Sequence, residues 1–289
     1  MRRFAYERPG SLAEATRVLW EAGDEAMVLA GGTDLVVGLR DESLRPRVVV
    51  DLKRVLDLSG PTIVRQDGRY LFSALAVMGE VEAHEGVFAE LRALAEAARW
   101  VGSVQIRNRA TLAGNVCTCS PAADTIPPLL VYGATAVVLG PHGERRVLLD
   151  DFILGAKRTD LRRGELVTAI EVPIPPAGFG AAYTRLVRRR GTDLASITLC
   201  AAVEPEGAAI LAYGSVGPRA FLVRDDSGVL ADPEAAPEAR AAVLEELLSQ
   251  ASPSARSLRA SPDYRLAMLR VLSMRALDTA LARSSRSAR

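Results

Sequence analysis

Apolar residues recur at helical spacing near the start of the chain, in the stretch "RPGSLAEATRVLWEAGD". The positions that share one face of the predicted helix are Leu12, Ala15, Val18 and Leu19. Ser11 and Glu14 form a capping box at its start, and Gly23 ends it. Short apolar runs at 26–30 and 47–52 predict two strands, the first of them buried. The first segment, residues 1 to about 55, is therefore predicted to form a small β-α-β-type unit.

The middle of the chain continues with strand and helix patterns. Two short strands are predicted around Gly68, and residues 88–102 are typical of a second amphipathic helix. In 134–152, β-branched runs flank a Pro-His-Gly turn, which predicts a hairpin. A strand is predicted in 165–176, and the prolines that end it indicate a domain boundary near residue 178.

The last part of the chain carries strand patterns first and helical patterns afterwards. The predicted strands cover 181–188, 196–204, 208–215 and 219–224, and the predicted helices cover 237–250 and 262–283. Strands followed by helices are typical of an α+β domain. No internal repeat is visible in the sequence.

Composition and charge exclude several classes of function. The chain has 289 residues, 49% of them hydrophobic, and a formal net charge of +1, which gives no general reason to expect nucleic acid or a membrane surface as partner. The densest basic run, Arg188 to Arg190, is short and has no nearby aromatic platform for bases except Tyr183. No apolar run approaches the roughly 18 residues of a membrane span, and the N-terminus lacks the apolar region of a signal peptide. With only three cysteines, the chain is expected to be a soluble cytoplasmic protein.

A pair of glycines follows the second predicted strand, in "MVLAGGTDLVVGLR". Gly31 and Gly32 allow the backbone to approach a ligand closely, and successive N–H groups in such a turn bind anions. Thr33 adds a hydroxyl donor, Leu35 begins a predicted helix, and Asp34 caps that helix or accepts a hydrogen bond from a hydroxyl. The spacing matches neither common nucleotide-binding fingerprint, so an ordinary strand-to-helix turn remains an alternative.

A second glycine-bearing loop lies within residues 106–134. Thr111 precedes Gly114 and Asn115, and Asp124 follows a Ser-Pro turn. The amide of Asn115 offers both donors and an acceptor, and Asp124 suits the hydroxyls of a sugar. Two such loops indicate a long ligand with phosphates and a polyol. The alternative for Asp124 is a structural cap on a helix predicted over 125–132.

The two loops together resemble a known family. "AGGTDL", "TLAGNVCTCSPAADTIPPLLVYGA", "LVTAIEVPIP" and "YTRLVRRRGTDLASITLCAAV" occur in the order and context found in the FAD-binding (medium) subunits of the molybdenum hydroxylases, the xanthine dehydrogenase and carbon monoxide dehydrogenase family. The resemblance implies an α+β fold. A two-subdomain FAD-binding domain of the vanillyl-alcohol-oxidase (PCMH) type would span 1–177, with subdomains of about 1–55 and 56–177, and a smaller α+β C-terminal domain would span 178–289.

The resemblance also implies which residues hold FAD. The segment expected to wrap the diphosphate is Leu29, Ala30, Gly31, Gly32, Thr33, Asp34 and Leu35, and the second flavin loop is Thr111, Leu112, Ala113, Gly114 and Asn115. Asp124 is expected at the ribityl chain or a nearby polar edge, Val167 at the flavin ring through its backbone, and Arg185 as a positive charge near the cofactor. Two positions depart from the family pattern: Ala113 replaces a frequent glycine and Arg185 a frequent lysine.

The function implied by the resemblance is electron transfer within a molybdenum-containing hydroxylase or dehydrogenase complex. The expected partners are a large subunit with the molybdenum cofactor and a small subunit with 2Fe-2S clusters, in a heterotrimer or a dimer of heterotrimers. FAD would take electrons from the clusters and pass them to NAD, oxygen or another acceptor. The chain itself would supply no catalytic residue. The alternatives are a stand-alone FAD-dependent oxidoreductase of the same fold and a non-catalytic nucleotide-binding or scaffold protein.

The remaining candidate residues are given structural roles. Cys117 and Cys119 have the wrong spacing for a zinc or iron–sulfur site, so no metal is expected in this chain. His84 and His142 are expected at the surface. Trp100 is expected in the core, with a position near the adenine of the flavin as the alternative.

Overall fold

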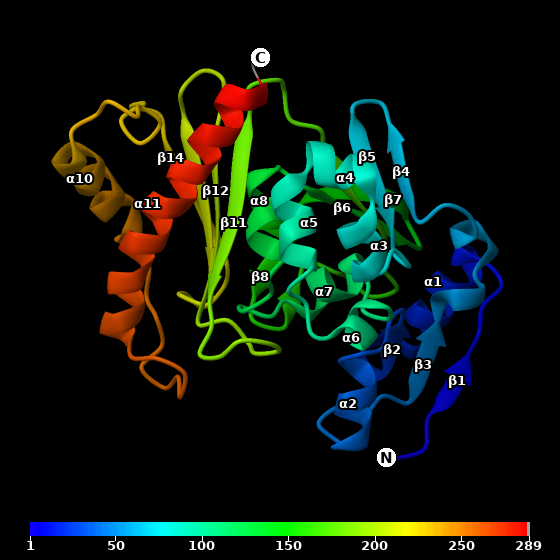
Figure 1. Cartoon of the computed structure of the whole chain (residues 1–289). Helices are drawn as coiled ribbons and strands as arrows, with labels where there is room; N and C mark the ends of the chain where they lie inside the picture. The colour runs from blue at the N-terminus through cyan, green and yellow to red at the C-terminus, as the bar shows by residue number, and fades with distance from the viewer. Residues whose placement is uncertain (288–289) are drawn as a thin grey trace.

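The computed structural model of the chain describes residues 1–287. Figure 1 shows a small N-terminal sheet at one side, a central part in which helices cover a second sheet, and a C-terminal sheet crossed by a long helix. Among the residues described, no helix combines the length and the apolar character needed to cross a bilayer.

The N-terminal subdomain is a three-stranded parallel sheet with two helices. Its elements are β1 (Ala5–Glu7), α1 (Leu12–Ala22), β2 (Ala26–Leu29), α2 (Leu35–Arg40) and β3 (Val48–Asp51), with the strand order β1-β3-β2 and single 3-10 turns at 23–25, 52–54 and 56–58. The predicted helix is confirmed: the Ser11 hydroxyl accepts from the Glu14 N–H, and Gly23 ends the helix with φ +57°. The reciprocal half of the capping box is absent, because the Glu14 carboxylate accepts from Gly10 instead. The prediction that β2 is buried is wrong, since this edge strand is only half-buried.

The central part is a five-stranded antiparallel sheet in the order β4-β5-β10-β6-β7. The strands are β4 (Ile63–Gln66), β5 (Arg69–Ser73), β6 (Thr135–Gly140), β7 (Gly143–Leu148) and β10 (Leu166–Pro173). The helices are α3 (Met78–Ala83), α4 (Glu85–Glu90), α5 (Arg92–Ala98), α6 (Val104–Arg107), α7 (Leu112–Thr118), α8 (Ile126–Val131) and α9 (Leu149–Phe152), and β8 (Ile153–Gly155) pairs with β9 (Arg158–Thr159). The strands around Gly68 and the hairpin are as predicted.

The helix predicted over 88–102 is instead two helices. α4 and α5 meet at Leu91, which leaves the helical region of backbone space with φ −124° and ψ 46°. The apolar pattern continues across this break because Val87, Leu91 and Leu94 are all fully buried on the same side. Hydrophobic periodicity therefore indicated a helical segment with a buried side and could not locate the break.

The C-terminal sheet has a hydrophobic core on both faces. Its strands are β11 (Gly180–Leu186), β12 (Ile197–Val203), β13 (Ala209–Gly214) and β14 (Phe221–Asp225), all antiparallel and in sequence order. One face packs against α5 and α8 of the central part, and the other is covered by α11 (Pro262–Ser287), next to α10 (Pro237–Leu248). The all-apolar burial of β12 and β13 follows from this position between two layers.

Candidate cofactor site

The first glycine loop presents a row of unpaired backbone donors. It connects the end of β2 to the start of α2, and the N–H groups of residues 31–35 have no acceptor among the described residues. Gly32 has φ +77°, and a Cβ there would lie 2.6 Å from the Cδ1 of Leu29. The turn therefore requires glycine, and its successive N–H groups have the arrangement that binds anions.

The two predicted loops touch each other. A Cβ on Gly31 would lie 2.1 Å from the carbonyl oxygen of Arg109 and 3.0 Å from the Cα of Ala110. The carbonyl oxygen of Ala110 accepts a hydrogen bond from the N–H of Met78. Beside it, Val77 and Thr111 pair in an isolated antiparallel β-bridge. The absence of a side chain at Gly31 is what brings the first loop against the segment that leads into the second.

The second motif is the beginning of a helix, which the sequence did not predict. Thr111 is the N-cap of α7, and its hydroxyl oxygen accepts from the N–H of Gly114 at 3.1 Å. Leu112 and Ala113 are buried, so only their backbone is available to a ligand. The methyl group of Ala113, where the family often has glycine, lies in the core.

Asn115 is oriented by a neighbour that sequence reasoning did not select. The hydroxyl of Thr125 donates to its Oδ1 at 2.7 Å. The side-chain NH₂ of Asn115 has no acceptor among the described residues, so both of its hydrogens remain available to a ligand. Thr125 is completely buried, and its only sequence signal is its place at the start of an apolar helix.

Asp124 and Arg185 form one buried ion pair. Asp124 Oδ1 accepts from Nη1 of Arg185 at 2.9 Å and from the hydroxyl of Tyr183 at 2.5 Å. Arg185 also donates to the carbonyl oxygens of Trp100, at 3.1 Å, and Asp193, at 2.5 Å, while its buried Nε has no partner among the described residues. Burial raises the pKa of Asp124 to about 6, although Arg185 and Tyr183 act in the opposite direction.

One alternative and one expectation about this region are wrong. Asp124 does not cap α8, because the N-cap is Thr125 and no side chain caps it. Trp100 is not in the core: it is 48% exposed, and the guanidinium of Arg185 lies 5.5 Å from its ring centroid. The regular part of α5 ends at Ala98, so Trp100 no longer follows the buried face of the helix.

Val167 lies at a β-bulge in β10. The register shifts between Val167 and Ala169, which pair with Val138 and Val137 respectively. The side chain of Val167 is buried, so any contact with a ligand is made by its backbone. A bulge turns the backbone locally, which is common next to binding sites.

Lys53 is a further candidate that sequence reasoning missed. Its Nζ lies 2.6 Å from Oδ1 of Asp51 and 3.5 Å from the carbonyl oxygen of Ala30, which begins the glycine loop. Asp51 is buried at the end of β3 and also accepts from the hydroxyl of Tyr6. Burial tends to raise the pKa of Asp51, but the bonds from Lys53 and Tyr6 lower it overall. The sequence feature that could have indicated this role is a lysine two residues after a buried aspartate at the end of a strand.

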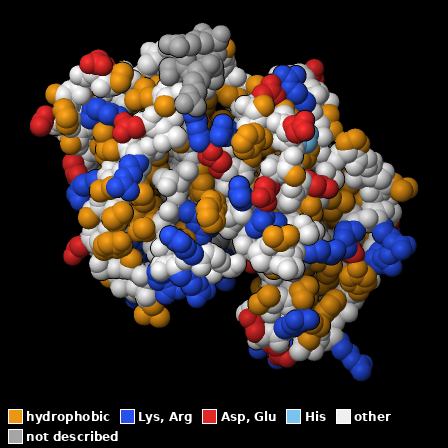
Figure 2. Space-filling model, viewed as in Figure 1, with side chains coloured by type: hydrophobic (Ala, Val, Ile, Leu, Met, Phe, Trp, Pro, Cys, Tyr) orange, Lys and Arg blue, Asp and Glu red, His pale blue; other side chains and the backbone are white. Residues whose placement is uncertain are grey.

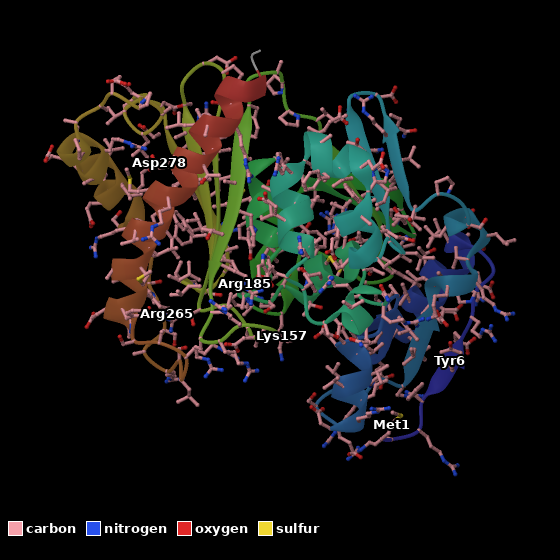
Figure 3. The ribbon with its side chains drawn as sticks, in the orientation of Figure 1. Met1, Tyr6, Lys157, Arg185, Arg265 and Asp278 are labelled. Carbon is pink, nitrogen blue, oxygen red and sulfur yellow. The ribbon has the colours of Figure 1, made fainter. Side chains whose placement is uncertain are left out.

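A cleft separates the two sides of this region. Figure 2 shows the surface hollowed between the N-terminal lobe and the rest of the molecule. Bonds from Ser43 lower the pKa of Asp41, the residue after α2, and the charge of Lys157, on the β8–β9 turn, adds to the effect. Figure 3 labels Lys157 and Arg185 close to each other in this view, above the level of Met1 in the N-terminal lobe.

The cysteines and histidines take no part in this arrangement. Within residues 1–287, no three His, Cys, Asp or Glu side chains are grouped so that they could hold a metal ion. Burial raises the pKa of Cys117 to about 12, which makes it a poor nucleophile. His84 is partly exposed and accepts the Val87 N–H to begin α4, and His142 is exposed in the β6–β7 turn.

Comparison with known proteins covers almost the whole chain. The family described as "FAD binding domain in molybdopterin dehydrogenase" matches residues 2–175, and "CO dehydrogenase flavoprotein C-terminal domain" matches 181–280. The carbon monoxide dehydrogenase medium chain of Hydrogenophaga pseudoflava is 31% identical over 97% of this chain and 98% of its own length. The xanthine dehydrogenase FAD-binding subunit of Escherichia coli O157:H7 is 27% identical over 96% of each chain.

Solved structures show the same architecture. A chain of carbon monoxide dehydrogenase from Hydrogenophaga pseudoflava superposes with a TM-score of 0.89 at 31% identity, covering 98% of both chains. The predicted fold class, an FAD-binding domain followed by a smaller C-terminal domain, is confirmed by this match together with the two family matches.

Proposed function

The chain belongs to the family of FAD-binding subunits of the molybdenum hydroxylases, as its sequence motifs predicted, and from this premise we propose that it transfers electrons through FAD within a multi-subunit dehydrogenase. Its relatives are dehydrogenase subunits, which makes this chain part of an oxidoreductase. The proposal concerns the direction of electron flow, the partners and the acceptor.

The observation that carries the proposal is the row of unpaired N–H groups at residues 31–35, set against the backbone of Arg109. These donors fit the two negative charges of a diphosphate, and Lys53 adds a cation beside the same loop. The NH₂ of Asn115 offers a further donor group to a long polar ligand. The residues present therefore fit FAD as the family description names it.

FAD, when bound, supplies the electron-transfer chemistry. The residues of this chain bind and orient it. The backbone of residues 31–35 would hold the diphosphate, and the first turn of α7 would hold the flavin side through backbone and amide donors. The bulge at Val167 would place main-chain atoms against the ring, and Arg185 with Asp124 would fix the polar edge between the central part and the C-terminal sheet.

The proposed electron donor is a small subunit with 2Fe-2S clusters, which receives electrons from a large subunit with the molybdenum cofactor. Support comes from the relatives, several of which are named medium chains and therefore come from complexes of more than one chain. We propose a heterotrimer, or a dimer of heterotrimers, in the cytoplasm. Reduced FAD would pass two electrons to NAD, oxygen or another carrier.

The stand-alone flavoenzyme is disfavoured by the C-terminal part. Residues 181–280 match the flavoprotein C-terminal domain of carbon monoxide dehydrogenase, not a separate substrate-binding domain. Its buried polar groups are mostly used in structural bonds, such as that between Tyr213 and Ser273.

An absorption spectrum of the purified chain, before and after denaturation, tests the cofactor, and the mass of the released chromophore identifies it. Stoichiometric FAD is the expected result. If folded protein contains no flavin and takes up none when FAD is added, the proposal fails. Association with a small iron–sulfur subunit at micromolar concentration, followed by reduction of the flavin through that subunit, tests the electron path.

A further inference from the structure

A side chain from the central part caps the first helix of the N-terminal subdomain. Arg163, in the loop before β10, donates from Nε to the carbonyl oxygen of Trp20 at 2.8 Å and from Nη2 to that of Glu21 at 3.3 Å. These carbonyls belong to the last turn of α1, which has no basic residue of its own. Arg163 therefore supplies both the hydrogen bonds and the positive charge that a helix C-terminus favours.

The contact is closely fitted. The guanidinium carbon of Arg163 lies 5.6 Å from the centroid of the Trp20 ring. A Cβ on Gly23 would lie 3.0 Å from that guanidinium carbon, and a Cβ on Gly164 would lie 3.1 Å from the Trp20 side chain. Both glycines have positive φ, +57° and +79°, so each allows the turn and leaves room for the partner side chain.

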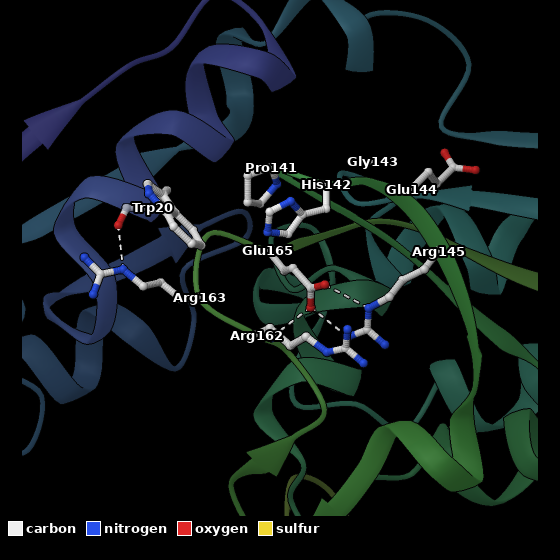
Figure 4. A pocket seen from close by; sticks show the side chains of 9 residues that line it. All are labelled: Trp20, Pro141, His142, Gly143, Glu144, Arg145, Arg162, Arg163 and Glu165. Atoms are coloured by element: carbon white, nitrogen blue, oxygen red, sulfur yellow. Dashed lines mark hydrogen bonds and ion pairs between the residues drawn. The ribbon is translucent and has the colours of Figure 1, made fainter.

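The contact of Arg163 with α1 lies at the edge of a cavity between the two subdomains. The cavity has a volume of about 410 Å³. Figure 4 shows the side chains that line this cavity, between α1 and the β6–β7 turn. On the far wall, Arg145 and Glu165 are bound to each other at 2.7 and 2.8 Å, within the central part. His142 meets the Trp20 ring edge-on at 6.0 Å. Among the described residues that line this cavity, Arg163 makes the hydrogen bonds that join the two subdomains.

Both chain segments that leave this contact lead to the proposed flavin site. β2 begins at Ala26, just after Gly23, and ends at the glycine loop. β10 begins at Leu166, and Val167 lies four residues after Arg163. At about 3.3 Å per strand residue, Val167 is within roughly 13 Å of the contact along the chain.

We infer that Arg163 is a positioning residue: by holding the end of α1 against the loop before β10, it sets the separation of the two walls of the FAD cleft. The inference rests on the proposed function, since it assumes that FAD binds between these walls. Arg163 does not touch the proposed cofactor loops and acts through Trp20 and the two strands.

The test uses the full-length chain, freed of flavin and titrated with FAD. Arg163→Ala removes the hydrogen bonds and the ring contact, and Arg163→Lys keeps the charge with one donor group. Arg162→Ala is the matched control, because Arg162 is the adjacent exposed arginine and its side chain makes no hydrogen bond among the described residues, although its charge acts on Glu165. We expect FAD to bind about fivefold to tenfold more weakly to Arg163→Ala, with an intermediate value for Arg163→Lys and no change for Arg162→Ala.

Hydrogen exchange provides the local readout. In Arg163→Ala we expect faster exchange in residues 24–35, with no change in the C-terminal sheet. If Arg163→Ala binds FAD as tightly as Arg162→Ala and exchanges like it, the inference is overturned while the proposed function stands. A general loss of helical circular dichroism in both Arg163 variants would also overturn it, assigning the residue to folding alone. A wild-type chain that binds no FAD would overturn the proposed function itself.

Discussion

Asp124 and Arg185, both predicted as separate flavin contacts, hold each other at 2.9 Å across the junction of the central part and the C-terminal sheet. Their side chains are 12% and 6% exposed, so the pair is shielded from solvent. Tyr183 lies two residues before Arg185 on β11, and its hydroxyl donates to the same carboxylate oxygen. The two residues therefore act as one unit, and a change in either alters the position of the other.

The buried carboxyl group predicts a pH dependence of stability. The pKa of Asp124 is raised by burial to about 6 in the folded chain, from 3.8 when exposed. The folded state then binds the proton more tightly than the unfolded state, so stability from this group is present below about pH 4 and is lost as pH rises towards 6. We expect Asp124→Asn to flatten the pH dependence of the unfolding free energy between these values, by urea unfolding at several pH values.

The control for this experiment is Asp24→Asn, because Asp24 is exposed and its side chain has no hydrogen bond among the described residues. Its pH profile should match that of the wild type. An unchanged slope in Asp124→Asn would show that the carboxyl group titrates equally in both states.

The contact between Gly31 and Arg109 predicts the effect of a single methyl group. In Gly31→Ala the new Cβ would overlap the carbonyl oxygen of Arg109, so the two loops must separate. We expect a loss of about 1 to 3 kcal/mol in stability and FAD binding weakened at least about tenfold. Flavin content after purification and a melting curve measure the two effects.

Gly155→Ala is the matched control, since nothing lies within 4 Å of a Cβ there and the backbone is not in the left-handed region. It should keep both the flavin and the melting temperature of the wild type. Full flavin occupancy in Gly31→Ala would mean that the loop tolerates the added methyl and that the cradle is not defined by this contact.

Removal of the Thr125 hydroxyl is predicted to weaken FAD binding through Asn115, although the hydroxyl itself is not proposed to contact FAD. Thr125→Val removes the donor that orients the Asn115 amide and leaves the shape of the side chain nearly unchanged. The loss of one buried hydrogen bond is worth about 1 kcal/mol, so we expect FAD to bind about fivefold more weakly. Fluorescence titration with FAD measures this change.

Thr16→Val serves as the comparison, because it removes another largely buried threonine hydroxyl, bonded only to the Ala13 carbonyl within α1. Equal loss of FAD affinity in the two variants would point to a general effect of losing a buried hydroxyl. A loss in Thr125→Val alone would assign it to the orientation of Asn115.

Local signals in the sequence predicted those parts of the fold that depend on neighbouring residues. Ser11 and Gly23 bound α1, and turn residues separate β4 from β5 and β6 from β7, as expected from their own conformational preferences. The break at Leu91 was missed because tertiary packing, not the apolar pattern, decides where a buried helix is interrupted. Trp100 was misplaced for a similar reason, since a helix that ends two residues earlier no longer carries its buried face forward.

The candidate site was predictable where the backbone itself is the ligand-binding group. The two glycines of the first loop indicate a close approach directly, and the structure adds Arg109 as the group approached. The role of Thr125 depends on its contact with Asn115, and that of Tyr183 on its contact with Asp124, far earlier in the chain, and no local pattern contains that information. Assignment of individual residues to FAD remains a prediction for all the residues proposed.

The position of Lys53 predicts that its positive charge strengthens FAD binding, a contribution that the sequence motifs do not indicate. Its ammonium group lies beside the carbonyl of Ala30, at the start of the row of N–H donors. Lys53→Met keeps the aliphatic stem and removes the charge, so FAD should bind about threefold to tenfold more weakly at low salt. Because salt screens a partly exposed cation, the difference from wild type should shrink as ionic strength rises to about 0.5 M.

Arg54→Ala provides the control for nearby charge, because Arg54 is the next residue, is exposed, and its side chain has no hydrogen bond among the described residues. We expect its FAD affinity to stay within about twofold of the wild type at every salt concentration. Melting curves of both variants separate binding from stability, since Lys53→Met also leaves the buried Asp51 with Tyr6 as its one side-chain partner among the described residues. If Lys53→Met loses affinity equally at low and high salt, the lysine acts by supporting the shape of the loop through Asp51, and the electrostatic role is excluded.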